Sequence, residues 1–166
     1  NALIYLFKRE EIPIDVVQGI YVNTLNGRVD FGSTSDDIKK VSEFLKDYRC
    51  SERGWNFAVD IDHQVGKNAD FSRIDLKSDK VCCVMRVKIA GGYWHYITAF
   101  YEMGDYIYCY DPYFKKEKET RNWCLKKMRD GCNLRIKRKY LFAEKDCGVY
   151  RTGVSRDREF ILIKKN

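Results

Sequence analysis

The chain has 166 residues, a formal net charge of +7, 45% hydrophobic residues and 14% aromatic residues. This composition excludes a disordered tail, and the length predicts a single domain over residues 1–166 that buries a core without disulfide staples. No apolar stretch approaches the roughly 20 residues of a membrane-spanning helix and no signal peptide is evident, so membrane insertion is not expected.

Three helices are expected in the first third of the chain. Residues 1–8 have the pattern of a helix interior, without an N-terminal cap. Pro13 can begin a second helix, which would end at Asn26-Gly27. Its apolar positions recur at helical spacing, namely Ile14, Val17, Ile20, Tyr21 and Leu25. Thr34 predicts the N-cap of a third helix whose first turn is acidic and whose apolar stripe runs to Tyr48.

Beyond Gly54 the apolar residues alternate, which is typical of strands. Strands are expected over 55–61, 81–87, 96–101, 106–110, 134–142 and 159–164, with a short helix over 122–129. The strand at 81–87 is so apolar that burial on both faces is expected. Because the helices come first and the strands follow, the sequence predicts an α+β fold with an antiparallel sheet rather than an alternating, doubly wound one.

The seven cysteines do not form the pattern of a disulfide framework or a metal site. Their number is odd, Cys82 and Cys83 are adjacent, and no C-x-x-C occurs. Free cysteines in the core are typical of a reducing compartment, so a cytoplasmic location is expected. No cofactor and no metal are implied, and the oligomeric state is not indicated.

Basic residues gather late in the chain and raise the question of nucleic-acid binding. They are Arg121, Lys126, Lys127, Arg129, Arg135, Lys137, Arg138 and Lys139. No aromatic RNA-binding motif, zinc-finger spacing or helix-turn-helix pattern accompanies them, so the charge favours a solvated face over a nucleic-acid site. A nucleic-acid-binding module is kept only as a third alternative.

His95 and Asp111 are the candidate catalytic residues, because a hairpin can bring them together. If Glu102–Gly104 is a three-residue loop, His95 lies directly opposite Asp111 on the same face. A two-residue turn at Met103–Gly104 would place the two side chains on opposite faces unless a bulge compensates. A carboxylate that orients an imidazole is what an activated thiol requires, although an ordinary cross-strand pair has the same pattern.

The segments His95 to Phe100 and Asp105 to Tyr113 resemble the His/Asp half of papain-like bacterial cysteine peptidases. The similar group is the bacteriocin-processing (double-glycine leader) peptidases and their uncharacterised relatives. The resemblance extends from Asn1 to about Tyr113 and implies a papain-like fold, with N-terminal helices packed on an antiparallel sheet. It implies that His95 transfers the proton and that Asp111 orients the imidazole of His95. The nucleophilic Cys and a Gln of the oxyanion hole would lie before Asn1.

The expected function is therefore thiol-dependent acyl transfer, as in a cysteine peptidase acting on a peptide. Transfer to an amine, as in the acyltransferases of butirosin-type biosynthesis, is an alternative with the same base and a peptide or acyl substrate. A catalytically inactive, peptidase-like binding domain is the alternative from another class.

The remaining cysteines and the second histidine are weaker candidates. Cys50, Cys82, Cys83 and Cys109 are interpreted as core or surface residues. His63 is expected in a loop, where Asp60 and Asp62 flank it as candidate metal ligands or partners.

Overall fold

The computed structural model of the chain describes residues 1–24, 33–49, 56–114, 124–129 and 131–166, the segment 124–129 by its backbone alone. The expected turn at Asn26-Gly27, Cys50 and Trp55 lie outside the described residues, as do the side chains of Arg121 to Arg129.

Three helices form where the sequence predicts them: α1 (Ala2–Leu6), α2 (Ile14–Thr24) and α3 (Ser35–Asp47). The start of α3 is fixed by reciprocal hydrogen bonds, since the Asp37 N–H donates to the Thr34 hydroxyl (3.2 Å) and the Thr34 N–H to the Asp37 carboxylate (2.8 Å). The apolar stripe expected on α2 is wrong. Val16 is the buried residue of α2, while Ile14 and Tyr21 are 68% and 65% exposed.

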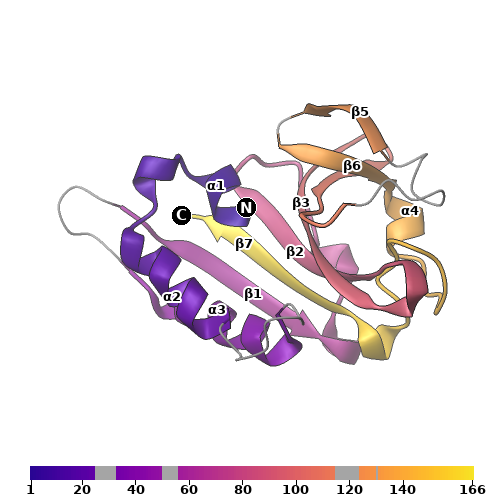
Figure 1. Ribbon diagram of the computed structural model, residues 1–166, viewed down its shortest axis with the longest axis horizontal. Coiled ribbons are helices and arrows are strands. Elements are labelled where there is room, and N and C mark those ends of the chain that lie inside the picture. The colour runs from indigo at the N-terminus through magenta and orange to yellow at the C-terminus, as the bar shows by residue number, and fades with distance from the viewer. Residues whose placement is uncertain (25–32, 50–55, 115–123, 130) are drawn as a thin grey trace.

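The strands form one sheet in which all neighbours run antiparallel (Figure 1). They are β1 (Val59–Val65), β2 (Val81–Lys88), β3 (Trp94–Met103), β4 (Tyr106–Tyr110), β5 (Cys124–Arg129), β6 (Cys132–Lys137) and β7 (Glu159–Lys165). Their order in the sheet is β1-β7-β2-β3-β4-β6-β5. The predicted α+β class with an antiparallel sheet is confirmed.

Two element predictions after residue 120 are wrong. Within the segment expected as a helix over 122–129, Cys124–Arg129 form strand β5, which pairs with β6; Gly131, just before β6, has a φ of 78°. The strand expected over 134–142 ends at Lys137 and is followed by the short helix α4 (Arg138–Leu141). The chain turns there because the Arg138 N–H donates to the Asp105 carbonyl, and its guanidinium binds the Glu102 carboxylate at 2.6 Å.

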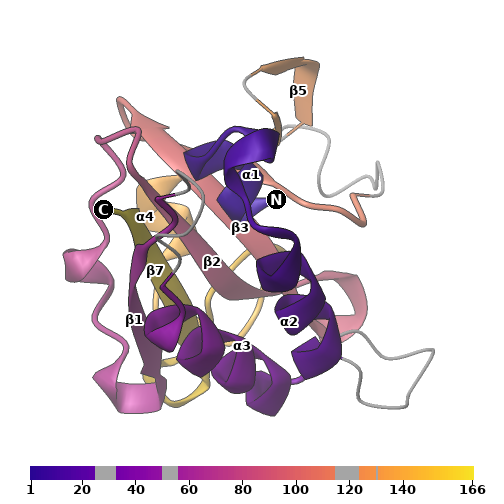
Figure 2. The same ribbon diagram turned by 90° about the vertical axis from the view of Figure 1, so that its left-hand side faces the viewer.

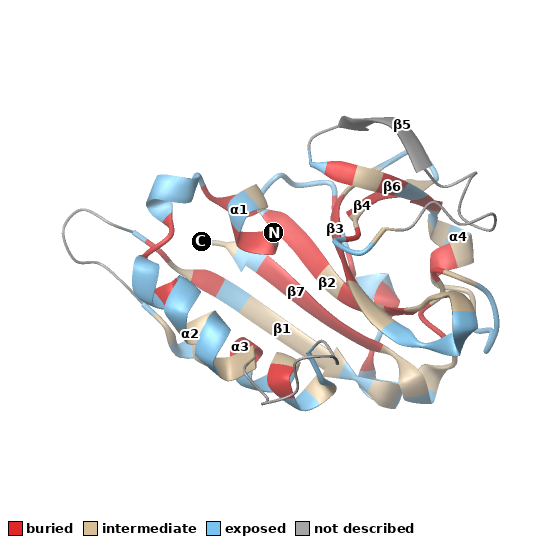
Figure 3. Cartoon of the chain, viewed as in Figure 1, coloured by how far each residue is buried: buried red, intermediate tan, exposed pale blue. Residues whose placement is uncertain are grey.

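The two faces of the sheet carry separate hydrophobic clusters. On the face that we call the helix face, α1, α2 and α3 cover the sheet, as Figures 1 and 2 show, and Cys82 and Ile161 point toward them. On the opposite face, which we call the loop face, Cys83 and Val87 pack under Leu141 of α4 and under the segments around Phe71 and Tyr150. Figure 3 shows β2 and β7 as the most buried strands, so β2 is buried on both faces as predicted.

Candidate active site at the β3–β4 hairpin

The β3–β4 hairpin has a different register from the one the sequence suggests. Met103 pairs with Tyr106, so the turn has two residues and begins with Gly104, whose φ of 59° suits the first central position of such a turn. A bulge between Ala99 and Tyr101 then shifts the register by one residue. The three-residue loop and the direct pairing of His95 with Asp111 are absent, but the bulge restores the relation between faces that a two-residue turn alone would have lost.

His95 and Asp111 meet despite the altered register. Continuing the pairing of Thr98 with Tyr110 places Asp111 opposite Ile97, so that His95 is its diagonal neighbour on the same face. His95 Nε2 lies 2.7 Å from Asp111 Oδ1. The side chain of His95 is 15% exposed and that of Asp111 is 3% exposed. The imidazole therefore has a fixed partner and a small opening to solvent.

Asp111 is held as an ionised acceptor. The Tyr150 hydroxyl donates to its Oδ2 (2.7 Å), and the Tyr113 N–H donates to its Oδ1 (2.8 Å). The Asn133 side chain brackets the Asp111 backbone, accepting from its N–H (2.9 Å) and donating to its carbonyl (2.7 Å). Burial acts to raise the pKa of Asp111, but the hydrogen bonds from His95 and Tyr150 outweigh it and hold this pKa below its usual value.

The backbone at Tyr150 is adapted to this contact. Tyr150 has a φ of 57°, the one positive φ of a non-glycine residue in the part of the chain that the structure describes. Such conformations carry strain and are found preferentially at functional sites, where the surroundings maintain them. Sequence reasoning missed Tyr150 and Asn133, because both lie far from the hairpin in sequence and neither belongs to a local motif.

The pair lies on the loop face, opposite the N-terminal helices. His95 pairs directly with Val87, a member of the loop-face cluster, and directly opposed residues share a face. Helix α1 packs on the helix face, where the Cys82 thiol lies 3.7 Å from the Ala2 carbonyl oxygen. The first helix and the His95–Asp111 pair are thus separated by the sheet.

Three cysteines are unsuited to nucleophilic attack. Burial raises the pKa of Cys82 to about 12, and it raises the pKa of Cys83 and of Cys109 well above the usual value for a thiol. Cys147 is exposed. The interpretation of Cys82, Cys83 and Cys109 as core residues therefore agrees with their burial.

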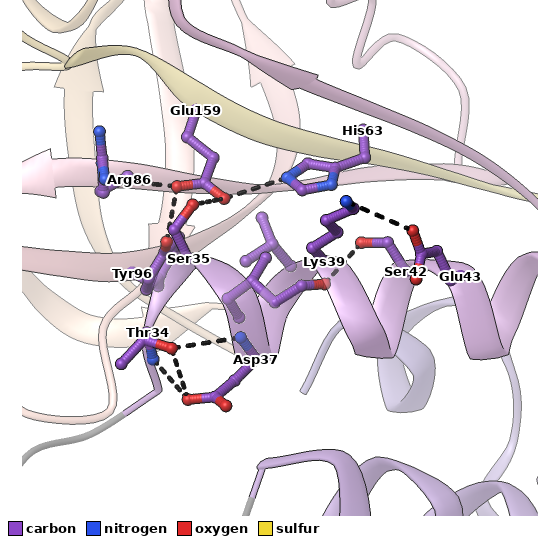
Figure 4. A network of polar contacts seen from close by, with 12 residues as sticks. Thr34, Ser35, Asp37, Lys39, Ser42, Glu43, His63, Arg86, Tyr96 and Glu159 are labelled. Carbon is purple, nitrogen blue, oxygen red and sulfur yellow. Dashed lines mark hydrogen bonds and ion pairs between the residues drawn. The ribbon is translucent and has the colours of Figure 1, made fainter. Parts of the chain in front are cut away.

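The second histidine lies in a strand, not in the expected loop. His63 belongs to β1, and its Nε2 lies 3.0 Å from Glu159 Oε1 of β7 (Figure 4). Glu159 was missed because 96 positions separate it from His63. The one sequence signal for Glu159 is a carboxylate directly before the apolar run 160–163. Within the described ranges no three His, Cys, Asp or Glu side chains gather as a metal site would require, so Asp60 and Asp62 do not form one with His63.

The described basic residues of the late cluster contact the fold itself. Arg135 and Lys137 lie over the ring of Tyr106, at 5.3 Å and 5.8 Å from its centroid. Arg138 is paired with Glu102. These contacts agree with a structural interpretation of the charge. None of the helices in the described ranges has the length and apolar character needed to cross a membrane.

Comparison with known proteins gives no assignment: no family model, no curated protein and no solved structure matches the chain significantly. The function must therefore be argued from the site itself.

Proposed function

We propose that the chain is a thiol-dependent acyl-transfer domain of the papain-like cysteine peptidase type, acting on a peptide or acyl substrate. The observation that carries this proposal is the 2.7 Å contact between His95 Nε2 and the buried carboxylate of Asp111. Two further donors, from Tyr150 and from the Tyr113 backbone, hold that carboxylate in place.

The geometry supports His95 as a general base. Because Asp111 accepts the Nε2–H, the lone pair of the neutral imidazole is on Nδ1, which has no hydrogen-bond partner among the described residues. Nδ1 can take the proton from a thiol as its sulfur attacks a carbonyl carbon, and then return it to the leaving amine. Asp111 fixes the tautomer and stabilises the intermediate imidazolium. Water as the final acceptor makes the domain a peptidase, and an amine makes it an acyltransferase.

The thiol must reach the loop face. Cys82, beside Ala2, precedes Val87 by five positions on β2 (87 − 82 = 5), and five positions correspond to about 16 Å of strand. A thiol beside α1 would lie about that far along β2 from His95, and on the other face of the sheet. The proposal therefore requires a thiol that approaches His95 from the loop face.

Alkylation rates test the proposal. The chain is expressed with any residues that precede Asn1 in the gene product, and iodoacetamide labelling at neutral pH is followed for each cysteine by mass spectrometry. Exposed Cys147 serves as the reference for an ordinary thiol. We expect one cysteine to react faster than Cys147 in the wild type and to lose that advantage in His95→Gln. If no thiol exceeds Cys147, or if the substitution changes no rate, the proposed acyl-transfer function is wrong.

A second candidate function is a peptide-binding domain that has no nucleophile. The observation that favours it is the position of α1 on the helix face, away from His95. This function predicts saturable binding of peptides with no turnover and no enhanced thiol reactivity in the same labelling experiment.

A further inference from the structure

The second His–carboxylate pair of the chain lies on the other face of the sheet and has no part in the proposed function. His63 of β1 is held by Glu159 as His95 is held by Asp111, through Nε2 in both cases. Its side chain is 13% exposed, and that of Glu159 is fully buried. Figure 4 shows His63 between the sheet and α3, where the Lys39 amine is joined to Glu43 and the Ser42 hydroxyl donates to the Ile38 carbonyl (2.8 Å).

Glu159 is fully engaged as an acceptor. Its Oε1 accepts from Ser35 (2.9 Å) and from His63, and its Oε2 accepts from Tyr96 (2.7 Å) and lies 3.4 Å from an Arg86 nitrogen. Four donors match the four lone-pair sites of an ionised carboxylate. The Nε2–H of His63 is therefore committed, and Nδ1 is the ring nitrogen that remains for a ligand. It has no hydrogen-bond partner among the described residues.

His63 lines a cleft of about 540 Å³ between α3 and β1. This volume suits a small ligand. The lining is mostly polar, with Lys39, Ser42, Glu43 and Lys46 from α3, Asp62 and Gln64 from β1, and Asn68 just after β1. Lys39, Ser42 and Lys46 are spaced by three and four positions, so one face of α3 runs along the cleft.

The ion pairs of the cleft leave positive charge available. Asp62 is occupied by Arg73 at 3.2 Å and by the Gln64 amide. Glu43 is 3.9 Å from Lys39, and both side chains are more than 60% exposed, so this pair is weak and Lys39 can turn toward a ligand. Lys46 has no ion pair within the described ranges. An anion is the ligand that this balance favours.

We propose that the cleft between α3 and β1 binds the phosphate group of a small phosphorylated ligand, with His63 and Lys46 as its principal contacts. The P–OH of a phosphate monoanion can donate to the Nδ1 lone pair of His63, while its other oxygens accept from Lys46, which binds them as a point charge. Glu159 occupies Nε2 of the imidazole, so Nδ1 is the ring nitrogen left for the ligand.

Nuclear magnetic resonance of the two imidazoles tests this proposal, since His63 and His95 are the only histidines of the chain. The wild-type protein is titrated with inorganic phosphate, with phosphoserine and with acetate, at fixed neutral pH and constant ionic strength. We expect the His63 nitrogens to shift saturably with both phosphates and the His95 nitrogens to remain in place. Tighter binding of phosphoserine than of inorganic phosphate would identify an organic monophosphate as the ligand, and the reverse order would identify the free ion.

Two lysine substitutions distinguish phosphate binding in the cleft from a general attraction to the positive charge of α3. Lys46→Gln should weaken phosphate binding about tenfold, the effect of losing one charge-assisted contact. Lys40→Gln removes the same charge from an exposed position of α3 outside the cleft lining and should leave binding unchanged. The inference is overturned if His63 does not respond to phosphate, if both lysine variants weaken binding equally, or if acetate binds as tightly as phosphate. His63→Gln, which keeps a donor for Glu159 but lacks Nδ1, should abolish the shift of backbone amides near the cleft.

Discussion

Replacing Glu159 with glutamine tests the structural role of the buried carboxylate most directly, because the expected loss of stability does not depend on what the protein does. The amide keeps the size of the side chain but loses the charge opposite Arg86 and presents an N–H₂ to groups that donate. Breaking a buried, hydrogen-bonded charge pair costs about 3–5 kcal/mol, and hydrogen bonds to a charged group contribute about 1.5–3 kcal/mol each. Arg86 also donates to the Asp157 carbonyl, so it keeps one partner when the Glu159 charge is removed. We therefore expect a loss of stability at the lower end of the first range, about 3 kcal/mol.

Urea unfolding at neutral pH, followed by circular dichroism, measures this loss. At an m-value of about 2 kcal/mol per molar urea, the midpoint should fall by about 1.5 M with the slope unchanged. Glu43→Gln is the matched control, because its exposed pair with Lys39 is worth about 0–1 kcal/mol. A loss below about 1 kcal/mol in Glu159→Gln, or an equal loss in the control, would refute the assigned role of the network.

The pH dependence of stability gives an independent check on Glu159. Burial acts to raise its pKa, but hydrogen bonds from His63 and Tyr96 outweigh burial and lower it below the usual value. A carboxyl with a lowered folded-state pKa contributes stability above its unfolded pKa, and this contribution disappears as the pH falls through the folded value. The wild type should therefore lose more stability on acidification than Glu159→Gln, in unfolding curves measured between neutral and acidic pH.

Three further predictions concern the candidate active site and the thiols. Asp111→Asn should lower any acyl-transfer turnover by roughly four orders of magnitude and release the proton of His95 from Nε2, which nitrogen chemical shifts will detect. Tyr150→Phe should cost about 1–2 kcal/mol in unfolding free energy and raise the pKa of Asp111, so that acid-induced loss of stability begins at higher pH. An unchanged carboxyl titration would contradict this role. Cys82, whose pKa burial raises to about 12, should resist iodoacetamide in the native protein while Cys147 reacts, and equal labelling would show that the first helix does not cover Cys82.

The local elements were largely predictable from the sequence, because local signals determine them. The Thr34 N-cap with its acidic first turn and the change from helical to alternating periodicity identified α3 and the strands that follow. The hairpin register was not predictable, since it depends on a two-residue turn and a bulge that leave no clear trace in residue type. The segment of β5 was misassigned because its spacing of apolar and basic residues fits a short helix as well as a strand.

The candidate site was predictable only where its residues lie in one hairpin. His95 and Asp111 belong to adjacent strands, so turn geometry was sufficient to suggest their contact. The partnership of His63 and Glu159 arises because β7 enters the sheet next to β1, a long-range pairing that periodicity cannot reveal. Tyr150 reaches Asp111 from an irregular segment, and no pattern of residue types predicts such an approach.

The place of β7 in the sheet has a consequence for the order in which the protein is assembled. Since β7 lies between β1 and β2, the strand β1 has no sheet to join until residues 159–165 have been synthesised. Pairings between such distant segments slow folding, because a long loop must close before contacts compensate for its lost entropy. On the ribosome, the first helices and β1 would therefore wait until residues 159–165 have emerged, with apolar surface exposed to chaperones. His63 would acquire its carboxylate partner in one of the last steps of folding.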